Sequence, residues 1–233
     1  MRILVAHGDR RWSLRVKHIL TSVGHAVDAA ETSHATIAHH GMYAYDLFLL
    51  ADTFTDGCGT ALCARLRSAG CRAGIILCAL HAHGSVVQMR IRALDAGADD
   101  YLELPYDAED LKARVRALLR RAPALTAPII HLGDVRLDTN TQRVVIRDHE
   151  VALTAKEYAI LEYMARNPDA LIARSVLWDH VWDANHDPAS RALEVHISNI
   201  RRKISQHSRD VVLHCRRGAG YVLKVHSDAR GTD

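Results

Sequence analysis

The first 121 residues repeat one pattern five times: a short apolar run, then a segment in which apolar residues recur at helical spacing. The apolar runs are continuous rather than alternating, so they predict strands that are buried on both faces, as in parallel sheets covered by helices. We expect strands at 3–6, 26–29, 46–50, 74–78 and 100–103, and helices at 14–23, 32–40, 59–69, 84–96 and 107–121. The pattern predicts an α/β doubly wound domain with a five-stranded parallel sheet, whose functional site lies at the carboxyl edge of the strands.

A different pattern follows a break in the chain. Residues 122–128 contain two prolines and no periodicity, and we interpret them as a linker. Beyond it we expect strands at 135–137 and 143–146, helices from 154 onward, at 174–181 and at 188–206, and a hairpin at 211–225. The first of these helices starts with a capping box, because Thr154 precedes Glu157 by three residues. This order predicts an α+β winged helix-turn-helix domain over 129–226, followed by a tail at 227–233.

Composition excludes several classes of protein. The 233 residues are 48% hydrophobic and 24% charged, with 30 Lys and Arg against 27 Asp and Glu. These fractions are typical of a soluble globular protein, and no apolar run approaches the ~20 residues of a membrane span. The five cysteines are odd in number and lack zinc-site spacing, so we expect a reducing, cytoplasmic location and no cofactor. Basic residues are shared evenly between the halves, so any nucleic-acid site must come from their local arrangement.

The expected helix at 188–206 has two contrasting faces. Its apolar residues would pack against the domain: Leu193, Ile197, Ile200 and Ile204. Another stripe holds Arg191, Val195, Ser198 and Arg202, with His196, Asn199 and Lys203 beside it. Such side chains suit the phosphates and base edges of a major groove, although a solvated surface helix would have a similar composition. Arg216 and Arg217, at the tip of the hairpin, are placed to enter a minor groove.

Several motifs of this half resemble the OmpR/PhoB-type winged-helix effector domain. They are Leu153-Thr154-x-Lys156-Glu157-Tyr158, Val181-Trp182, Arg191-Ala192-Leu193-Glu194-Val195-His196-Ile197 and Arg217-Gly218-x-Gly220-Tyr221. The resemblance implies that Arg191 and Arg201 contact phosphates and that His196, Ser198 and Asn199 face the groove. Because Asn pairs well with adenine whereas Arg prefers guanine, Asn199 predicts a base preference unlike that of relatives with arginine at this position.

The first half resembles a response-regulator receiver through Arg2-Ile3-Leu4-Val5 and through Gly97-Ala98-Asp99-Asp100-Tyr101-x-x-x-Pro105. Receivers of this family phosphorylate an aspartate, and they use an acidic pair for Mg²⁺, a Ser or Thr, and a Lys. In this chain those positions fall, in the same order, on Ala51, on His7 and Gly8, on Cys78 and on Leu104. The resemblance therefore implies a degenerate phosphorylation site. Asp9 and Asp52 are the carboxylates nearby, and Asp52, one residue late on the strand, is the residual candidate acceptor.

Charged residues late in the first half match those through which this subfamily forms symmetric dimers. They are Arg90, Asp95, Asp99, Asp100, Asp110, Arg114, Arg116 and Arg121. The resemblance implies a two-fold interface in which Arg90 of one copy faces Asp110 of the other, and Asp99 and Asp100 face Arg114 and Arg121. The alternative is an ordinary solvated surface, because exposed ion pairs contribute only ~0–1 kcal/mol each.

These features predict a sequence-specific DNA-binding transcriptional regulator that acts as a dimer, does not depend on phosphorylation and is not an enzyme. The expected partners are promoter or operator DNA, a second copy of the chain and, as an open alternative, RNA polymerase; no membrane partner is expected. Two other functions stay open at this point. One is a conventional regulator phosphorylated at Asp52. The other is a sensor of a metal, haem, redox state or a small molecule, for which the candidate side chains are His7, His39, His40, His81, His83, Cys58 and Cys78.

Overall fold

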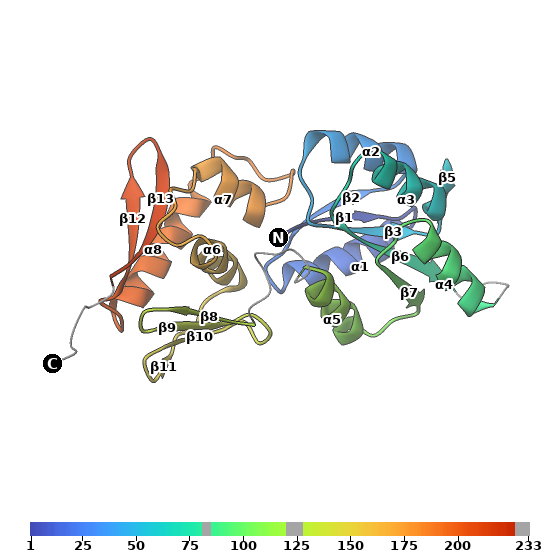
Figure 1. Cartoon of the computed structure of the whole chain (residues 1–233). Helices are drawn as coiled ribbons and strands as arrows, with labels where there is room; N and C mark the ends of the chain where they lie inside the picture. The colour runs from blue at the N-terminus through green and yellow to red at the C-terminus, as the bar shows by residue number, and fades with distance from the viewer. Residues whose placement is uncertain (81–84, 120–127, 227–233) are drawn as a thin grey trace. The chain divides into compact units, whose positions relative to one another are not determined.

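The chain divides into two compact units, Met1–Pro123 and Ala124–Asp233, in the computed structural model shown in Figure 1. The structure describes residues 1–80, 85–119 and 128–226. The expected linker therefore lies outside the described residues except for Pro128, and the expected tail lies outside them altogether. Within the described ranges, no helix has the length and apolar character that crossing a membrane requires.

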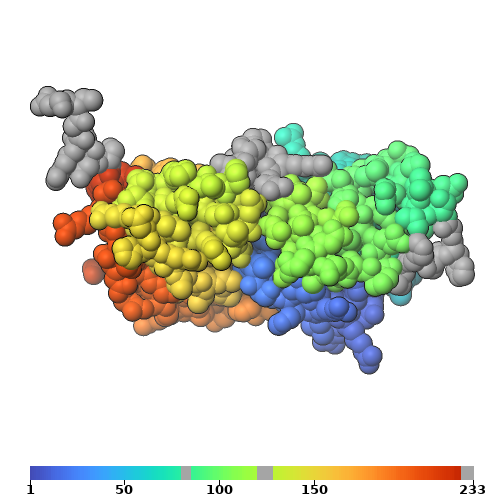
Figure 2. All heavy atoms as spheres, turned by 90° about the horizontal axis from the view of Figure 1, so that it is seen from below, coloured from blue at the N-terminus to red at the C-terminus, as the bar shows by residue number. Residues whose placement is uncertain are grey.

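The first unit is a parallel sheet between two layers of helices. Its strands pair in the order β2-β1-β3-β6-β7, with β1 at Arg2–Ala6, β2 at Ala26–Ala30, β3 at Leu47–Ala51, β6 at Gly74–Leu80 and β7 at Asp100–Leu104. Helices α1 (Arg10–Thr21) and α5 (Ala108–Leu119) cover one face, the layer that Figure 2 views in blue and green. Helices α2 (Ser33–Met42), α3 (Gly59–Ser68) and α4 (Val86–Asp95) cover the other. The predicted doubly wound fold is confirmed.

Four strands of this sheet end later than the sequence predicts, β2 and β7 by one residue each, and the changes in β3 and β6 concern residues expected at the functional site. β3 begins after Asp46, whose carboxylate accepts a hydrogen bond from the Arg2 N–H (2.7 Å), and it runs to Ala51. β6 continues to Leu80, so Cys78 lies inside this strand rather than at its end, and that expectation was wrong. Apolar residues continue past Cys78, and pattern alone does not show where such a run leaves the sheet.

The second unit combines a small sheet, three helices and a hairpin around one apolar core. The antiparallel sheet has the order β11 (His149–Glu150), β10 (Arg143–Ile146), β9 (Val135–Asp138) and β8 (Ile129–Leu132). Helices α6 (Ala155–Ala165), α7 (Arg174–Val181) and α8 (Ala192–Ser205) follow, and β12 (Val211–Arg216) pairs with β13 (Gly220–Val225). This arrangement confirms the winged helix. Strands β8 and β11, which are short and largely exposed, were not predicted.

The structure confirms one predicted helix start and corrects another. The capping box of α6 is present, since the Thr154 hydroxyl accepts from the Glu157 N–H (3.3 Å) and the Glu157 carboxylate accepts from the Thr154 N–H (2.9 Å). The expected start of α8 near Pro188 was wrong, because the helix begins at Ala192. Residues 187–190 form a separate turn instead, in which the Ser190 N–H bonds to a carbonyl three residues earlier.

Candidate nucleic-acid interface and receiver site

The two faces of α8 separate as the sequence predicts. The apolar face is buried in the domain core, with Leu193, Ile197, Ile200 and Ile204 each no more than 3% exposed. The other stripe is open: Arg191, Ser198 and Arg202 are exposed, and Val195 is 57% exposed. A partner can therefore approach this stripe without displacing any part of the domain.

Lys203, which the sequence placed among the DNA-contacting residues, is bound inside the domain. Its ammonium donates to the Glu157 carboxylate (2.8 Å) and to the carbonyl of Ala152 (2.8 Å). The Glu157 side chain is only 2% exposed. Burial opposes ionisation of Glu157, but the bonds from Lys203 and Thr154 hold its pKa below the usual value. Lys203 thus balances a buried charge between α6 and α8, and it is not a free cation on the helix surface.

Arg201 and His196 also make contacts within the domain. The exposed Arg201 donates from Nε to the carbonyl of Leu213 (2.9 Å), which ties α8 to strand β12 of the hairpin. The His196 ring lies 5.8 Å from the Trp182 ring, and burial lowers the pKa of His196. His196 Nδ1 is buried and has no hydrogen-bond partner among the described residues.

Arg174, at the start of α7, holds the beginning of α8 in place, and the sequence did not reveal this role. Its guanidinium donates to the carbonyls of Pro188 (2.6 Å) and Ser190 (2.7 Å), and to the Glu194 carboxylate (2.9 Å). These bonds fix the turn before α8 and the first turn of α8 itself. No periodicity links one arginine to carbonyls 14 and 16 residues away, so sequence pattern could not have found this contact.

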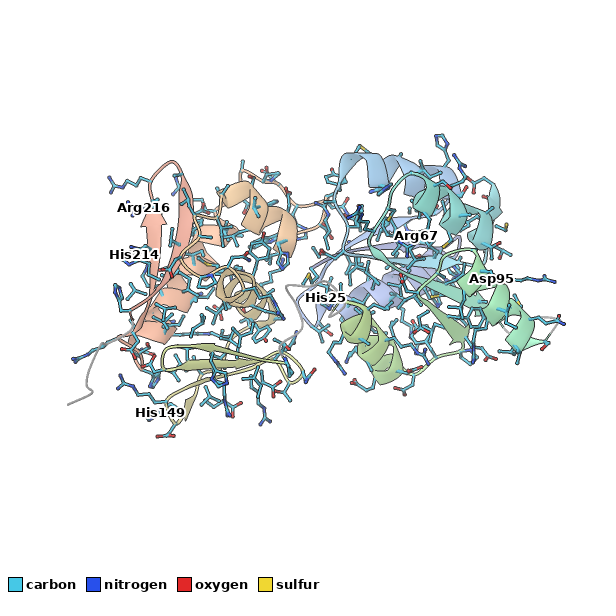
Figure 3. The ribbon with its side chains drawn as sticks, viewed as in Figure 1. His25, Arg67, Asp95, His149, His214 and Arg216 are labelled. Atoms are coloured by element: carbon cyan, nitrogen blue, oxygen red, sulfur yellow. The ribbon has the colours of Figure 1, made fainter. Side chains whose placement is uncertain are left out.

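The hairpin presents basic side chains at its tip. His214, Arg216 and Arg217 are exposed, and Figure 3 labels the first two on β12. Gly220 closes the turn with φ +142°, and a Cβ there would lie 2.1 Å from the carbonyl oxygen of Ile172. The turn therefore requires glycine because the neighbouring backbone leaves no room for a side chain.

The carboxyl edge of the receiver sheet carries buried, uncharged side chains at three of the positions predicted for a degenerate phosphorylation site. Ala51 pairs in register with Cys78, and the two are 1% and 0% exposed. Leu104, at the end of β7, is also buried. Asp52 follows β3, and its N–H donates to the Cys78 carbonyl while its carboxylate accepts from the Thr53 hydroxyl (3.3 Å). A hairpin that the sequence did not predict, β4 (Thr53–Phe54) with β5 (Gly57–Cys58), comes next.

The ring of His7 is held at this edge by contacts within the receiver. Its ring stacks on Trp12 (centroids 4.3 Å apart), and Nδ1 accepts a hydrogen bond from the Asp9 N–H (2.9 Å). Burial lowers the pKa of His7, although Asp9 and Asp52 nearby act in the opposite direction. The Asp9 carboxylate is already occupied as the cap of α1, accepting from two backbone N–H groups of the helix. Two separated carboxylates and an imidazole do not fit Mg²⁺, which prefers an octahedral set of oxygen ligands.

The charges predicted for the dimer interface are partly paired within one chain. Arg114 donates to Asp100 (2.9 Å) and to Asp110 (2.9 Å). Asp99 instead binds Arg67 of α3 (2.7 Å), which Figure 3 labels. Arg90 and Asp95 are exposed on α4 and Arg116 is partly buried on α5, whereas Arg121 lies outside the described residues.

Helix α4 carries an exposed apolar stripe that was not predicted from the sequence. Val87, Ile91 and Leu94 are 62%, 52% and 45% exposed, and they recur at i, i+4 and i+7 on this helix. That spacing is visible in the sequence, but periodicity alone does not show whether a neighbouring element covers the stripe. Only Ala93 of α4 is fully buried.

The histidines and cysteines do not assemble into a metal site in the described part of the chain, where no three His, Cys, Asp or Glu side chains are placed to hold an ion. His39 instead bonds through Nδ1 to the Tyr45 hydroxyl (3.0 Å). His81 and His83 lie outside the described residues. Burial raises the pKa of the Cys78 thiol, whereas the exposed Cys58 has its pKa lowered by a hydrogen bond with Thr60.

Comparison with known proteins assigns both units. Residues 3–116 match the response regulator receiver domain, and residues 148–223 match the C-terminal domain of transcriptional regulatory proteins. The transcriptional regulatory protein TcrA of Mycobacterium tuberculosis is 38% identical over 226 residues, which cover 96% of this chain and 87% of TcrA. The response regulator MprA of Mycobacterium avium is 35% identical, covering 96% of this chain and 98% of MprA.

The chain belongs to the response regulators that regulate transcription. This regulator therefore joins a receiver to a DNA-binding domain that regulates transcription. Among solved structures, a two-component response regulator from Clostridium difficile is 31% identical, covering 53% of this chain and 98% of its own, with a TM-score of 0.49.

Proposed function

We propose that this regulator binds its DNA sites as a dimer and does not need an aspartyl phosphate to do so. The observation that carries the proposal is Ala51, a buried methyl group at the position to which the family resemblance assigns the phosphoryl acceptor. The methyl group of alanine has no nucleophilic atom that could accept a phosphoryl group. The neighbouring positions support the same conclusion, because His7, Gly8 and Leu104 supply neither Mg²⁺ ligands nor a cation to balance an added phosphoryl group.

Asp52 is a poor substitute acceptor. Phosphoryl transfer requires positive groups that neutralise charge on the three equatorial oxygens. The Lys position is the buried Leu104, and burial lowers the pKa of His7, the histidine nearby, which disfavours its charged form. The resemblance assigns an aspartate to position 51 and a lysine to position 104, and both positions hold uncharged residues here. At these two positions no buried charge is left without a partner, so this edge of the sheet can be stable without phosphate.

For the DNA contact, we assign base and phosphate recognition to the open stripe of α8. Arg191 and Arg202 would bind phosphates, and Ser198 and Asn199 would read base edges in the major groove. Arg216 and Arg217 on the hairpin would enter the adjacent minor groove. Arg201 and Lys203 support this surface from within the domain, and Arg174 holds the start of α8 in place.

For the dimer, the surface of α4, β7 and α5 offers an apolar centre with a charged surround. Val87, Ile91 and Leu94 supply exposed apolar area on α4. The Arg114 pairs with Asp100 and Asp110 link α5 to β7 and keep this surface in a fixed shape. Burial of three such side chains against a second copy would stabilise the dimer by a few kcal/mol at ~25 cal/mol per Å².

Phosphate independence is tested by measuring affinity for a selected DNA site before and after treatment with a small phosphodonor. We expect wild type and Asp52→Ala to bind equally well under both conditions, and neither to gain a phosphoryl mass. Asp46→Ala, at an aspartate before β3, is the control for removing one acidic residue from the receiver. An acid-labile mass gain and tighter binding that Asp52→Ala alone abolishes would refute the proposal.

The dimer is tested by sedimentation at micromolar concentration. Ile91→Asp should shift wild-type dimers to monomers, because it introduces a charge into the centre of the apolar stripe. Ala64→Asp, at an exposed position of α3 away from this surface, should leave the dimer intact. A monomeric wild type, or an equal effect of both variants, would contradict the assignment.

A further inference from the structure

Helix α1 of the receiver has a basic face. Its 12 residues include no acidic side chain. Arg10, Arg11, Arg15 and His18 are all exposed, and so is Leu14. The spacing of these residues, i, i+1, i+4, i+5 and i+8, places them along one side of the helix.

The three arginines of this face are available to an outside partner. Among the residues that the structure describes, none of the three guanidinium groups forms an ion pair or side-chain hydrogen bond. Three other arginines of the chain behave differently, since Arg67, Arg114 and Arg174 each bind a carboxylate. The face of α1 is thus a concentration of positive charge that the fold itself does not use.

Helix stability does not explain this arrangement. The N-terminus of a helix carries a partial positive charge, so cations in the first turn are unfavourable. Arg10 and Arg11 occupy that first turn, directly after the Asp9 cap. Because their position opposes the helix dipole, the benefit of these side chains must come from something outside the helix.

We propose that the α1 face binds the phosphate backbone of DNA flanking the site that the C-terminal domain recognises. The proposal rests on DNA binding by that domain, which keeps phosphates at a high local concentration around the covalently attached receiver. The guanidinium groups of Arg11 and Arg15 can each bind two phosphate oxygens, and such contacts do not depend on base sequence. An acidic protein surface is the competing partner, and the experiment below separates the two.

The test measures how the affinity of the full chain for DNA depends on salt. Each phosphate contact contributes about 0.9 to the slope of log affinity against log salt. On a long duplex with flanking DNA, Arg11→Ala/Arg15→Ala should lower the slope by about 2, which makes the loss of affinity between about 50 and 200 mM salt about tenfold smaller. On a duplex trimmed to the recognised site, the same variant should match wild type.

A control variant removes two other exposed receiver arginines, Arg65→Ala/Arg72→Ala, and has the same net charge. Its slope should equal that of wild type on both duplexes. An unchanged slope for the α1 variant on the long duplex would overturn the inference and favour an acidic protein partner. An equal decrease in the control would overturn it too, since the effect would then be one of net charge. Absence of wild-type binding to either duplex would instead refute DNA binding by the C-terminal domain.

Discussion

Replacing Lys203 by alanine should destabilise the C-terminal unit and leave its DNA contacts largely intact. Removing one partner of a buried ion pair costs about 3–5 kcal/mol. Lys203 is 25% exposed, so water can partly replace it, and Glu157 keeps its hydrogen bond from Thr154. We therefore expect a loss of about 2 kcal/mol in the free energy of unfolding. For a unit of about 100 residues this corresponds to a decrease of about 10 °C in Tm.

The pH dependence of this loss follows from the sign of the Glu157 shift. In the wild type the bonds from Lys203 and Thr154 outweigh burial, and the folded pKa of Glu157 is below its ordinary value. The pair therefore stabilises the protein above the unfolded pKa, about 4.3, and this stabilisation is lost as pH falls through the folded pKa. In Lys203→Ala, burial acts with less opposition and raises that pKa. The deficit of the variant should be largest at pH 7 and smaller near pH 4.5.

The measurement is urea unfolding followed by tryptophan fluorescence, because Trp178 and Trp182 lie in the core of this unit. Arg202→Ala is the matched control, since Arg202 is the adjacent exposed residue of α8. It should unfold within about 0.5 kcal/mol of wild type but lose about 0.9 from the salt slope of DNA binding. If Lys203→Ala were as stable as wild type and showed that slope decrease instead, Lys203 would be a DNA contact and the reasoning would be wrong.

Three further outcomes are expected. With iodoacetamide at pH 8, Cys58 should be alkylated much faster than the buried Cys78, as followed by mass spectrometry, and equal rates would contradict the structure. Gly220→Ala should unfold the hairpin and abolish DNA binding, because its Cβ would overlap a backbone carbonyl, whereas Gly41→Ala has open space and should be tolerated. Arg174→Ala should weaken DNA binding several-fold without changing its salt slope, since Arg174 positions α8 and does not touch phosphate; a slope lowered by about 1 would show a direct contact.

Local signals predicted the elements of this protein well where one residue pattern decides the structure. Continuous apolar runs gave the five parallel strands, and Thr154 with Glu157 gave the start of α6. The same signals failed at Pro188, because proline at the first turn of a helix and proline in a preceding turn look alike in sequence. Contacts from Arg174, far along the chain, decide between them.

Helix α8 also shows what spacing predicts and what only the structure decides. Helical spacing alone separated Leu193, Ile197, Ile200 and Ile204 from the open face, and burial confirms that separation. Spacing could not distinguish Arg202, which is open, from Lys203, which balances the charge of Glu157. Both are cations on one helix, but only Lys203 lies beside a carboxylate of another helix, Glu157 of α6.

The sequence by itself predicted the main strands and helices along the chain and showed which residue types stand at the carboxyl edge of the receiver sheet, because both depend on which side chain stands at each position. It also determined that Ala51 cannot accept a phosphoryl group. Tertiary structure decided which charges remain available. Arg114 and Lys203 are bound by carboxylates that folding brings to them from other elements, whereas Arg11 and Arg15 meet none among the described residues. Ion pairing depends on distances of a few ångströms, and only the packed chain sets those distances.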